Sequence, residues 1–151
     1  MEIRTGDLDS PEVIQLLREH LAGVALHSPP ESIHALGLAS LRNPDMTFWS
    51  VWEGGQLMGC AAIKELVAGH GEIKSMRTAA AHLRKGVAAL LMRHILDEAR
   101  RRSYRRLSLE TGSMDGFAPA RQLYASFGFT PCGPFADYVE DPNSVFMMRD
   151  V

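Results

Sequence analysis

The sequence lacks three features that would each assign it to a particular class of protein. No apolar run in its 151 residues approaches the roughly 20 needed to cross a bilayer. The first residues contain no apolar stretch of the kind found in secretory signals. The formal net charge of -2 offers no overall positive surface for nucleic acid. We therefore expect a cytoplasmic protein that binds neither membranes nor nucleic acid.

Cysteine is scarce, and its two occurrences have no partner within metal-ligand spacing. Cys60 and Cys132 stand alone, and in a reducing compartment we expect two buried free thiols and not a disulfide. His20, His27 and His34 recur every seven residues, but a proline pair interrupts the series and no carboxylate completes a ligand set. We expect no metal site.

The sequence also lacks repeats, low-complexity tracts and linkers. Its length suits one compact domain over residues 1–151. Neither the G-x-x-x-x-G-K-[ST] motif nor the G-x-G-x-x-G motif is present, which disfavours P-loop and Rossmann nucleotide sites.

What the sequence does contain is a clear succession of hydrophobic periods. Alternation and β-branched or aromatic runs predict strands, and apolar residues three or four positions apart predict helices. The expected order is strand 2–4, helix from 11, helix 31–42, strands 47–52, 57–66 and 72–78, helix 85–103, strand 106–111, helix 118–127 and one or two closing strands, the last at 145–149. A helix between the fourth and fifth strands implies that these two are parallel. The fold class is α+β, with a mixed, mostly antiparallel sheet flanked by helices.

Several local signals refine this scheme. Ser10 before a proline is a candidate helix cap, and Ser28 with Glu31 has the spacing of a capping box. Trp49 and Trp52 fit the core of the sheet. The basic run 100–102 fits a solvated helix C-terminus, where positive charge complements the helix dipole.

The junction of the fourth strand and the long helix is the best candidate for an anion site. A helix N-terminus offers unpaired N–H groups and the positive end of the helix dipole, and phosphate is its usual ligand. Gly86 allows close approach of the anion to the backbone, and Ala88 leaves room in the first turn. By itself, Gly86 fits equally well as a permissive residue near a helix start.

The whole chain resembles the GNAT superfamily of acyl-CoA-dependent N-acyltransferases. The resemblance comprises the element order, the loop His-Leu-Arg-Lys-Gly-Val-Ala at residues 82–88, and the segment 118–129, which matches A-x-x-L-Y-x-x-x-G-F. The loop, the Ser-Pro-Pro-Glu-Ser-Ile-His-Ala-Leu segment and Phe-Ala-Asp-Tyr are similar to the YsnE-type branch of these acetyltransferases. The loop departs from the family pattern at Leu83, where a Gln or Arg is usual, so a backbone cradle is retained without that side chain.

The resemblance implies a GNAT fold and acetyl-CoA as donor substrate, with no metal. It places the pyrophosphate over the loop, and it pairs the backbone of the fourth strand with the pantetheine arm. The implied donor-binding residues are Met76, Thr78, Leu83, Arg84, Lys85, Gly86, Val87, Ala88 and Ala89.

Acyl transfer to an amine requires a neutral amine, a donor for the oxyanion and a proton for the leaving thiolate. The family motif places Tyr124 near the thioester sulfur, as the candidate acid; a core aromatic is the alternative. Glu72 is the first candidate for the base because several family members carry a glutamate there, and Glu110 is its rival. Alternation puts Glu72 on one face with Lys74, Met76 and Thr78.

The acceptor side should be lined by His27 and Ser28, by Glu110 and by Tyr138 of the last hairpin. Arg77 could meet a carboxylate or lie at the surface, and we expect the surface. The leading hypothesis is direct transfer in a ternary complex to a small or amino-acid-like amine. Acetylation of a protein N-terminus or lysine, and a non-catalytic CoA-binding module, are the alternatives. A homodimer through a sheet edge is plausible.

Overall fold

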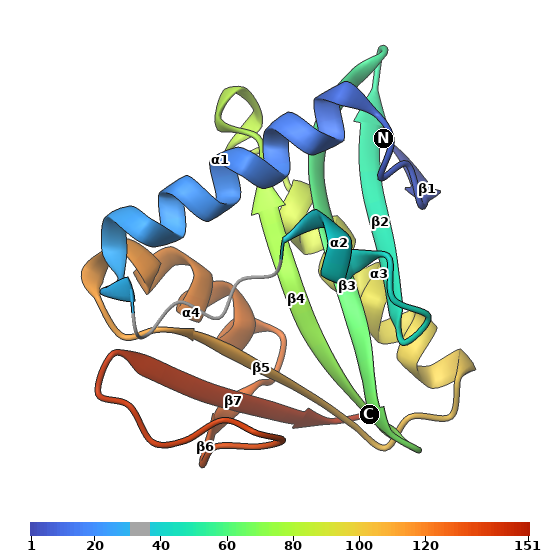
Figure 1. Ribbon diagram of the computed structural model, residues 1–151. Helices are drawn as coiled ribbons and strands as arrows, with labels where there is room; N and C mark the ends of the chain where they lie inside the picture. Colours follow the sequence, from blue (N-terminus) through green and yellow to red (C-terminus); the bar gives the residue numbers. More distant parts are fainter. Residues whose placement is uncertain (31–36) are drawn as a thin grey trace.

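The computed structural model describes residues 1–30 and 37–151, and their strands form one sheet (Figure 1). Across the described residues the strand order is β1-β2-β3-β4-β5-β7-β6, and only β4 and β5 are parallel neighbours. The strands are β1 (Glu2–Thr5), β2 (Met46–Glu53), β3 (Gln56–Val67), β4 (His70–Thr78), β5 (Arg106–Gly112), β6 (Thr130–Cys132) and β7 (Ser144–Asp150). The predicted element order and the parallel pair are confirmed.

Helices cover both faces of the sheet (Figure 1). The elements are α1 (Pro11–His27), α2 (Leu38–Leu41), α3 (Val87–Arg101) and α4 (Ala118–Ser126), with short 3₁₀ turns η2 (Ala80–His82) and η3 (Asp115–Phe117). The apolar stripe of α3 packs on one face, where Leu91, Met92 and Ile95 are fully buried. Helix α1 packs on the other face through a second cluster that includes Val13 and Leu16. This two-sided burial explains why β3 is buried over most of its length.

One predicted helix cap is wrong, and the second predicted helix is helical in only part of its described range. Helix α1 begins at Pro11 as expected, but the Ser10 hydroxyl makes no capping bond and donates instead to the Glu12 carboxylate at 2.7 Å. Ser28 is the residue that ends α1, and in the described part of the expected second helix only Leu38–Leu41 is helical. The remaining predicted positions of that helix and of the capping box, residues 31–36, lie outside the described residues, as does His34.

A bulge in β4 breaks the predicted alternation. Between the pairs Ala62–Lys74 and Cys60–Arg77, β3 has one residue where β4 has two, and Ser75 takes a positive φ of 55°. A bulge of this kind reverses the faces that follow it. Met76 consequently packs with the cluster under α3, and Thr78, paired with Gly59, follows it to that face. The predicted positions of Met76 and Thr78 on the face of Glu72 are wrong.

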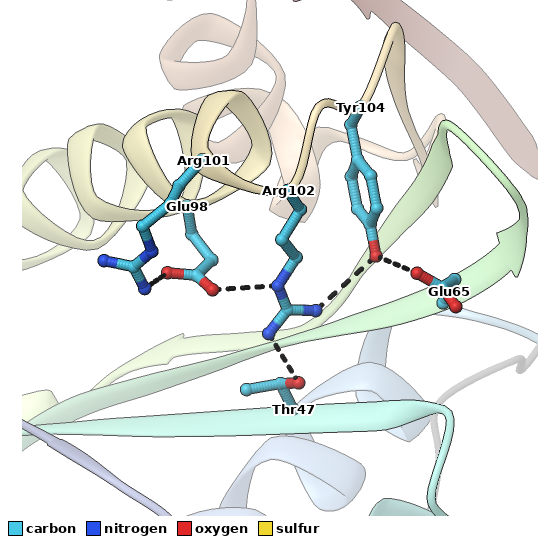
Figure 2. Close-up of polar contacts among 6 residues, drawn as sticks. All are labelled: Thr47, Glu65, Glu98, Arg101, Arg102 and Tyr104. Carbon is cyan, nitrogen blue, oxygen red and sulfur yellow. Dashed lines mark hydrogen bonds and ion pairs between the residues drawn. The ribbon is translucent and has the colours of Figure 1, made fainter.

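The structure confirms the predicted burial of the two tryptophans and corrects the predicted exposure of the basic run. Trp49 and Trp52 are buried in the core, as expected. Arg101 is exposed, but Arg102 departs from the expected solvated end: its guanidinium donates to Glu98 (2.8 Å) and to Thr47 on β2 (2.9 Å) (Figure 2). Tyr104 extends this network to Glu65 on β3 (3.0 Å), so the end of α3 is tied to the sheet.

Both cysteines are free thiols, as expected. Cys60 is fully buried, but Cys132 is only half-buried, so the predicted burial of this second thiol is wrong. Across residues 1–30 and 37–151, no helix is both long and apolar enough to cross a membrane.

Candidate active site

The parallel strands β4 and β5 separate soon after they pair. Their register covers only three residue pairs and ends at Glu72–Ser108, while both strands continue (Figure 1). The strand edges beyond that point face an opening in the middle of the sheet. Side chains from α1, β4, β5, η3 and α4 surround a cavity of about 360 Å³ there.

The roof of this cavity is the end of α1 resting on η3. The His27 ring meets the Phe117 ring edge-on, with centroids 5.7 Å apart. Gly116 permits this approach, since a Cβ there would stand 2.4 Å from the imidazole. The roof narrows the opening from the α1 side.

Glu72 lies in the wall of the cavity and is almost fully buried. One carboxylate oxygen accepts a hydrogen bond from the Tyr138 hydroxyl at 2.5 Å and one from the Lys74 ammonium at 3.1 Å. Lys74 also donates to the Tyr138 oxygen at 2.9 Å. Burial, then the charge of Glu72, raises the pKa of Tyr138 well above its ordinary value, so the phenol stays protonated. Glu72, Lys74 and Tyr138 are therefore all hydrogen-bonded to one another.

Glu110 lines the same cavity from β5 in a different electrostatic state. Burial raises the pKa of its carboxyl to about 7. A carboxyl in this range exchanges a proton readily near neutral pH, as a general base requires.

Tyr124 lies on α4 and is buried against the cavity. Burial, with a smaller contribution from the charge of Glu110, raises the pKa of its phenol to about 12. The hydroxyl therefore carries its proton at neutral pH and can donate it. The arrangement places a protonated phenol from α4 and a carboxyl from β5 on one cavity.

The loop before α3 has the geometry expected for binding an anion. Gly86 precedes the helix with a left-handed φ of 83°, and the first bond of the helix runs from the Leu90 N–H to the Gly86 carbonyl (3.0 Å). The N–H groups from Gly86 to Ala89 therefore have no carbonyl partner within the helix. The Val87 side chain is buried under β3, so this residue can offer only its N–H.

The edge of β4 beyond the bulge also leaves donors open. The Ala79 N–H points to β3, where it donates to the Met58 carbonyl (2.9 Å). Because successive N–H groups of an extended chain point to opposite edges, the Thr78 N–H faces the opening between the strands.

The structure thus gathers most of the predicted site residues. The cavity wall includes Glu72, Glu110, Tyr124, Tyr138, His27, Ser28 and Met76, whereas Leu83, Arg84, Lys85, Gly86, Val87, Ala88 and Ala89 form the separate loop at the start of α3. Arg77 lines the cavity, so the expectation that it lies at the surface is wrong. Sequence reasoning missed Lys74 as a partner of Glu72, although their spacing of two on a strand is a usable signal. It also missed His20 as a residue of the cavity wall, because no motif or spacing in the sequence indicates that position.

Comparison with known proteins identifies the family. Residues 11–129 match the model of the acetyltransferase (GNAT) family. The chain belongs to this family.

Within the GNAT family, the chain is 63% identical over 149 residues to the uncharacterized N-acetyltransferase YsnE of Bacillus subtilis (strain 168), covering 99% of each chain. Among solved structures, an acyl-CoA N-acyltransferase from Klebsiella pneumoniae has a TM-score of 0.80 at 25% identity, with 99% of this chain and 96% of that one covered. A GNAT acetyltransferase from Elizabethkingia anophelis, solved with acetyl-CoA bound, has a TM-score of 0.73 at 15% identity and covers 99% and 97% of the two chains.

Membership makes this chain an acyl-CoA-dependent N-acyltransferase whose donor is acetyl-CoA. The donor fits the observed features: open N–H groups at the start of α3 and an unpaired strand edge leading into the cavity. Within the described residues, no group of three or more His, Cys, Asp or Glu side chains could hold a metal ion.

Proposed function

We propose that this GNAT enzyme transfers the acetyl group of acetyl-CoA directly to the amine of a small molecule. The observation that carries the proposal is the cavity between β4 and β5, where Tyr124 and Glu110 line one space. The amine nitrogen attacks the thioester carbonyl, Glu110 takes the proton that the nitrogen loses, and the CoA thiolate leaves with the proton of Tyr124. Tyr124 holds its proton at neutral pH, and Glu110, with a pKa of about 7, is partly ionised there and can accept one.

We assign the base role to Glu110 and not to Glu72, the first choice from the sequence. The Oε2 atom of Glu72 is already hydrogen-bonded to the Tyr138 hydroxyl and the Lys74 ammonium. Glu110 has a pKa of about 7, which suits proton transfer at neutral pH. Glu72 then positions Tyr138 and Lys74 on the acceptor side, and His27 and Ser28 line the same cavity from the end of α1.

Direct transfer is supported by the character of the cavity wall. Among the described residues that line it there is no cysteine. Cys60 is fully buried, its thiol contacts the Ser75 carbonyl at 3.4 Å, and burial raises its pKa to about 12. A thiolate that could carry the acetyl group is therefore not supplied at the reaction centre.

The roof formed by His27 and η3 favours a small acceptor over a protein acceptor. A lysine or N-terminus of a folded protein would need a longer open groove across the sheet. The pyrophosphate cradle at residues 83–89 and the backbone contacts of Met76 and Thr78 complete the proposed donor site. The cytoplasmic location and the homodimer expected from the sequence stay predictions.

The test is an amine panel that follows CoA release and the acetylated product. The panel contains small primary amines, amino acids, and peptides with a free N-terminus or a lysine. We expect amine-dependent release with one or more small amines and little with the peptides. Preferred turnover of peptides would support the protein acetyltransferase, and release that no amine raises above hydrolysis would support a non-catalytic CoA-binding module.

A further inference from the structure

Arg77 presents a positive charge to the cavity with no negative partner in the described part of the chain. Its side chain lines the cavity and is half-buried, and its Nε atom is shielded from solvent without a hydrogen-bond partner. No carboxylate of residues 1–30 or 37–151 lies within ion-pair distance of its guanidinium. The other cation in the wall, Lys74, is already paired with Glu72.

The fold holds Arg77 in this position through two local features. The bulge at Ser75 reverses the alternation of β4, so the side chain of Arg77 extends toward α1. Gly23 on α1 makes room for it, because a Cβ at that position would stand 2.8 Å from the Arg77 Nη1 atom. Glycine in a helix interior costs up to about 1 kcal/mol relative to alanine, and here it admits the guanidinium.

His20 provides a second unsatisfied polar group beside Arg77. Its Nδ1 atom is buried without a hydrogen-bond partner in the described structure, and its ring lines the same cavity. Burial, then the charge of Arg77, lowers the pKa of His20 to about 4. The neutral ring has one N–H to donate and adds no competing negative charge.

Half-buried guanidinium groups without a partner are costly, and an anionic ligand removes that cost. The planar fork of arginine matches a carboxylate in two parallel hydrogen bonds. Glu72 and Glu110 line the same cavity and are its acidic side chains among the described residues. The wall is thus positive at one place and negative at another, as a zwitterion requires.

We propose that the acceptor carries a carboxylate that Arg77 binds, so that the substrate class is amino acids or closely related amino-carboxylic acids. This inference rests on the proposed function, because it names the acceptor of the same transfer. The bound carboxylate is held against Arg77 and His20 on the α1 side, and its amine is directed toward Glu110. Arg77 is then a specificity-determining residue and takes no part in proton transfer.

The test compares matched acceptors on wild type and variants. Each amino acid is assayed beside its own carboxamide. The amine of the carboxamide is less basic, so a larger fraction of it is neutral at the assay pH, and without a carboxylate site the carboxamide should be the better acceptor. For wild type we expect a lower KM for the acid. For Arg77→Met, which keeps an unbranched side chain about as long as the apolar stem of arginine but carries no charge, the KM for the acid should rise about 10- to 100-fold, as for loss of a charge-assisted hydrogen-bonded pair. The KM values for the carboxamide and for acetyl-CoA should stay within about twofold, and kcat should change little.

Two further variants separate a specific role from a structural one. Arg77→Lys should recover part of the affinity for the acid. Gly23→Ala keeps the charge but displaces the guanidinium, so it should raise the KM for the acid while unfolding at the same or a higher temperature.

The outcomes distinguish the two proposals. If wild type uses carboxamides or simple amines as well as the acids, or if Arg77→Met weakens both members of each pair equally, the carboxylate inference is overturned while the N-acetyltransferase stands. Preference for aminophosphonates over amino acids would also overturn it. If no amine of any kind raises CoA release in wild type, the proposed function itself fails.

Discussion

Replacement of Glu110 by glutamine should raise stability and lower activity at the same time. The pKa of Glu110 is raised from 4.5 to about 7 by burial. Between these values the folded protein binds a proton that the unfolded chain releases, so ionisation opposes folding as the pH rises, and the full cost is present above pH 7. At about 1.4 kcal/mol per pKa unit the upper bound is roughly 3 kcal/mol. Because the side chain is partly exposed, we expect about 1–3 kcal/mol.

The assay is urea unfolding of wild type and Glu110→Gln at pH 5 and pH 8. The variant should gain about 1–3 kcal/mol at pH 8 and much less at pH 5, where the wild-type carboxyl is protonated in the fold. In thermal unfolding, each kcal/mol should add about 2–4 °C for a chain of this size. Exposed Glu140→Gln is the matched control and should change stability by less than about 0.5 kcal/mol at either pH.

The same variant tests the role of Glu110 as base. Wild-type kcat/KM should rise with pH through about 7 as the carboxyl ionises, and Glu110→Gln should lose this rise together with about 10-fold or more of the rate. A gain in stability that is equal at pH 5 and pH 8 would refute the electrostatic reasoning. An unchanged rate with an unchanged pH profile would refute the assignment of the base.

Three further predictions address the acid, the loop and the end of α3. Tyr124→Phe should lower kcat about 10-fold or more by removing the proton donor while leaving the KM for acetyl-CoA nearly unchanged; wild-type turnover in this variant would contradict the role. Gly86→Ala should raise the KM for acetyl-CoA and destabilise the fold by about 1–2 kcal/mol, because the φ of 83° is unfavourable for alanine. The control is Gly133→Ala, where a Cβ meets nothing within 4 Å; it should change neither the KM for acetyl-CoA nor the stability. Arg102→Met should cost about 1–3 kcal/mol in chemical unfolding, because it removes the partner of the Oε1 atom of buried Glu98 and leaves only Arg101 at Oε2 (Figure 2). Exposed Arg101→Ala should cost under about 1 kcal/mol, and equal effects of the two variants would show that the contacts of Arg102 add nothing.

Much of the fold could be predicted because its local signals agree with its tertiary contacts. The Gly54-Gly55 turn takes positive φ at both residues, as the hairpin between β2 and β3 requires. The apolar stripe of α3 becomes one buried face, and Gly128 ends α4 with a left-handed φ of 85°. In these elements sequence period, turn chemistry and burial all favour the same structure.

The remainder could not be predicted because it depends on contacts between distant segments. Ser75 carries no sequence signal for a left-handed φ, yet its bulge decides on which faces Met76 and Arg77 lie. The pKa of Glu110 depends on the depth of a cavity that only the packed elements create. Arg102 was read from its basic neighbours as solvated, but Thr47, far away in the sequence, lies within reach of its guanidinium.

Single-turnover transfer from acetyl-CoA labelled in its acetyl group tests the central claim most directly. The enzyme is mixed with labelled donor, first alone and then with an amine substrate, and the label is followed on protein and product. We predict no label on the protein and no CoA release beyond hydrolysis until the amine is added, after which the label appears in the N-acetylated product. Label bound to the protein before the amine arrives, and transferred from it afterwards, would contradict direct transfer in the cavity between β4 and β5.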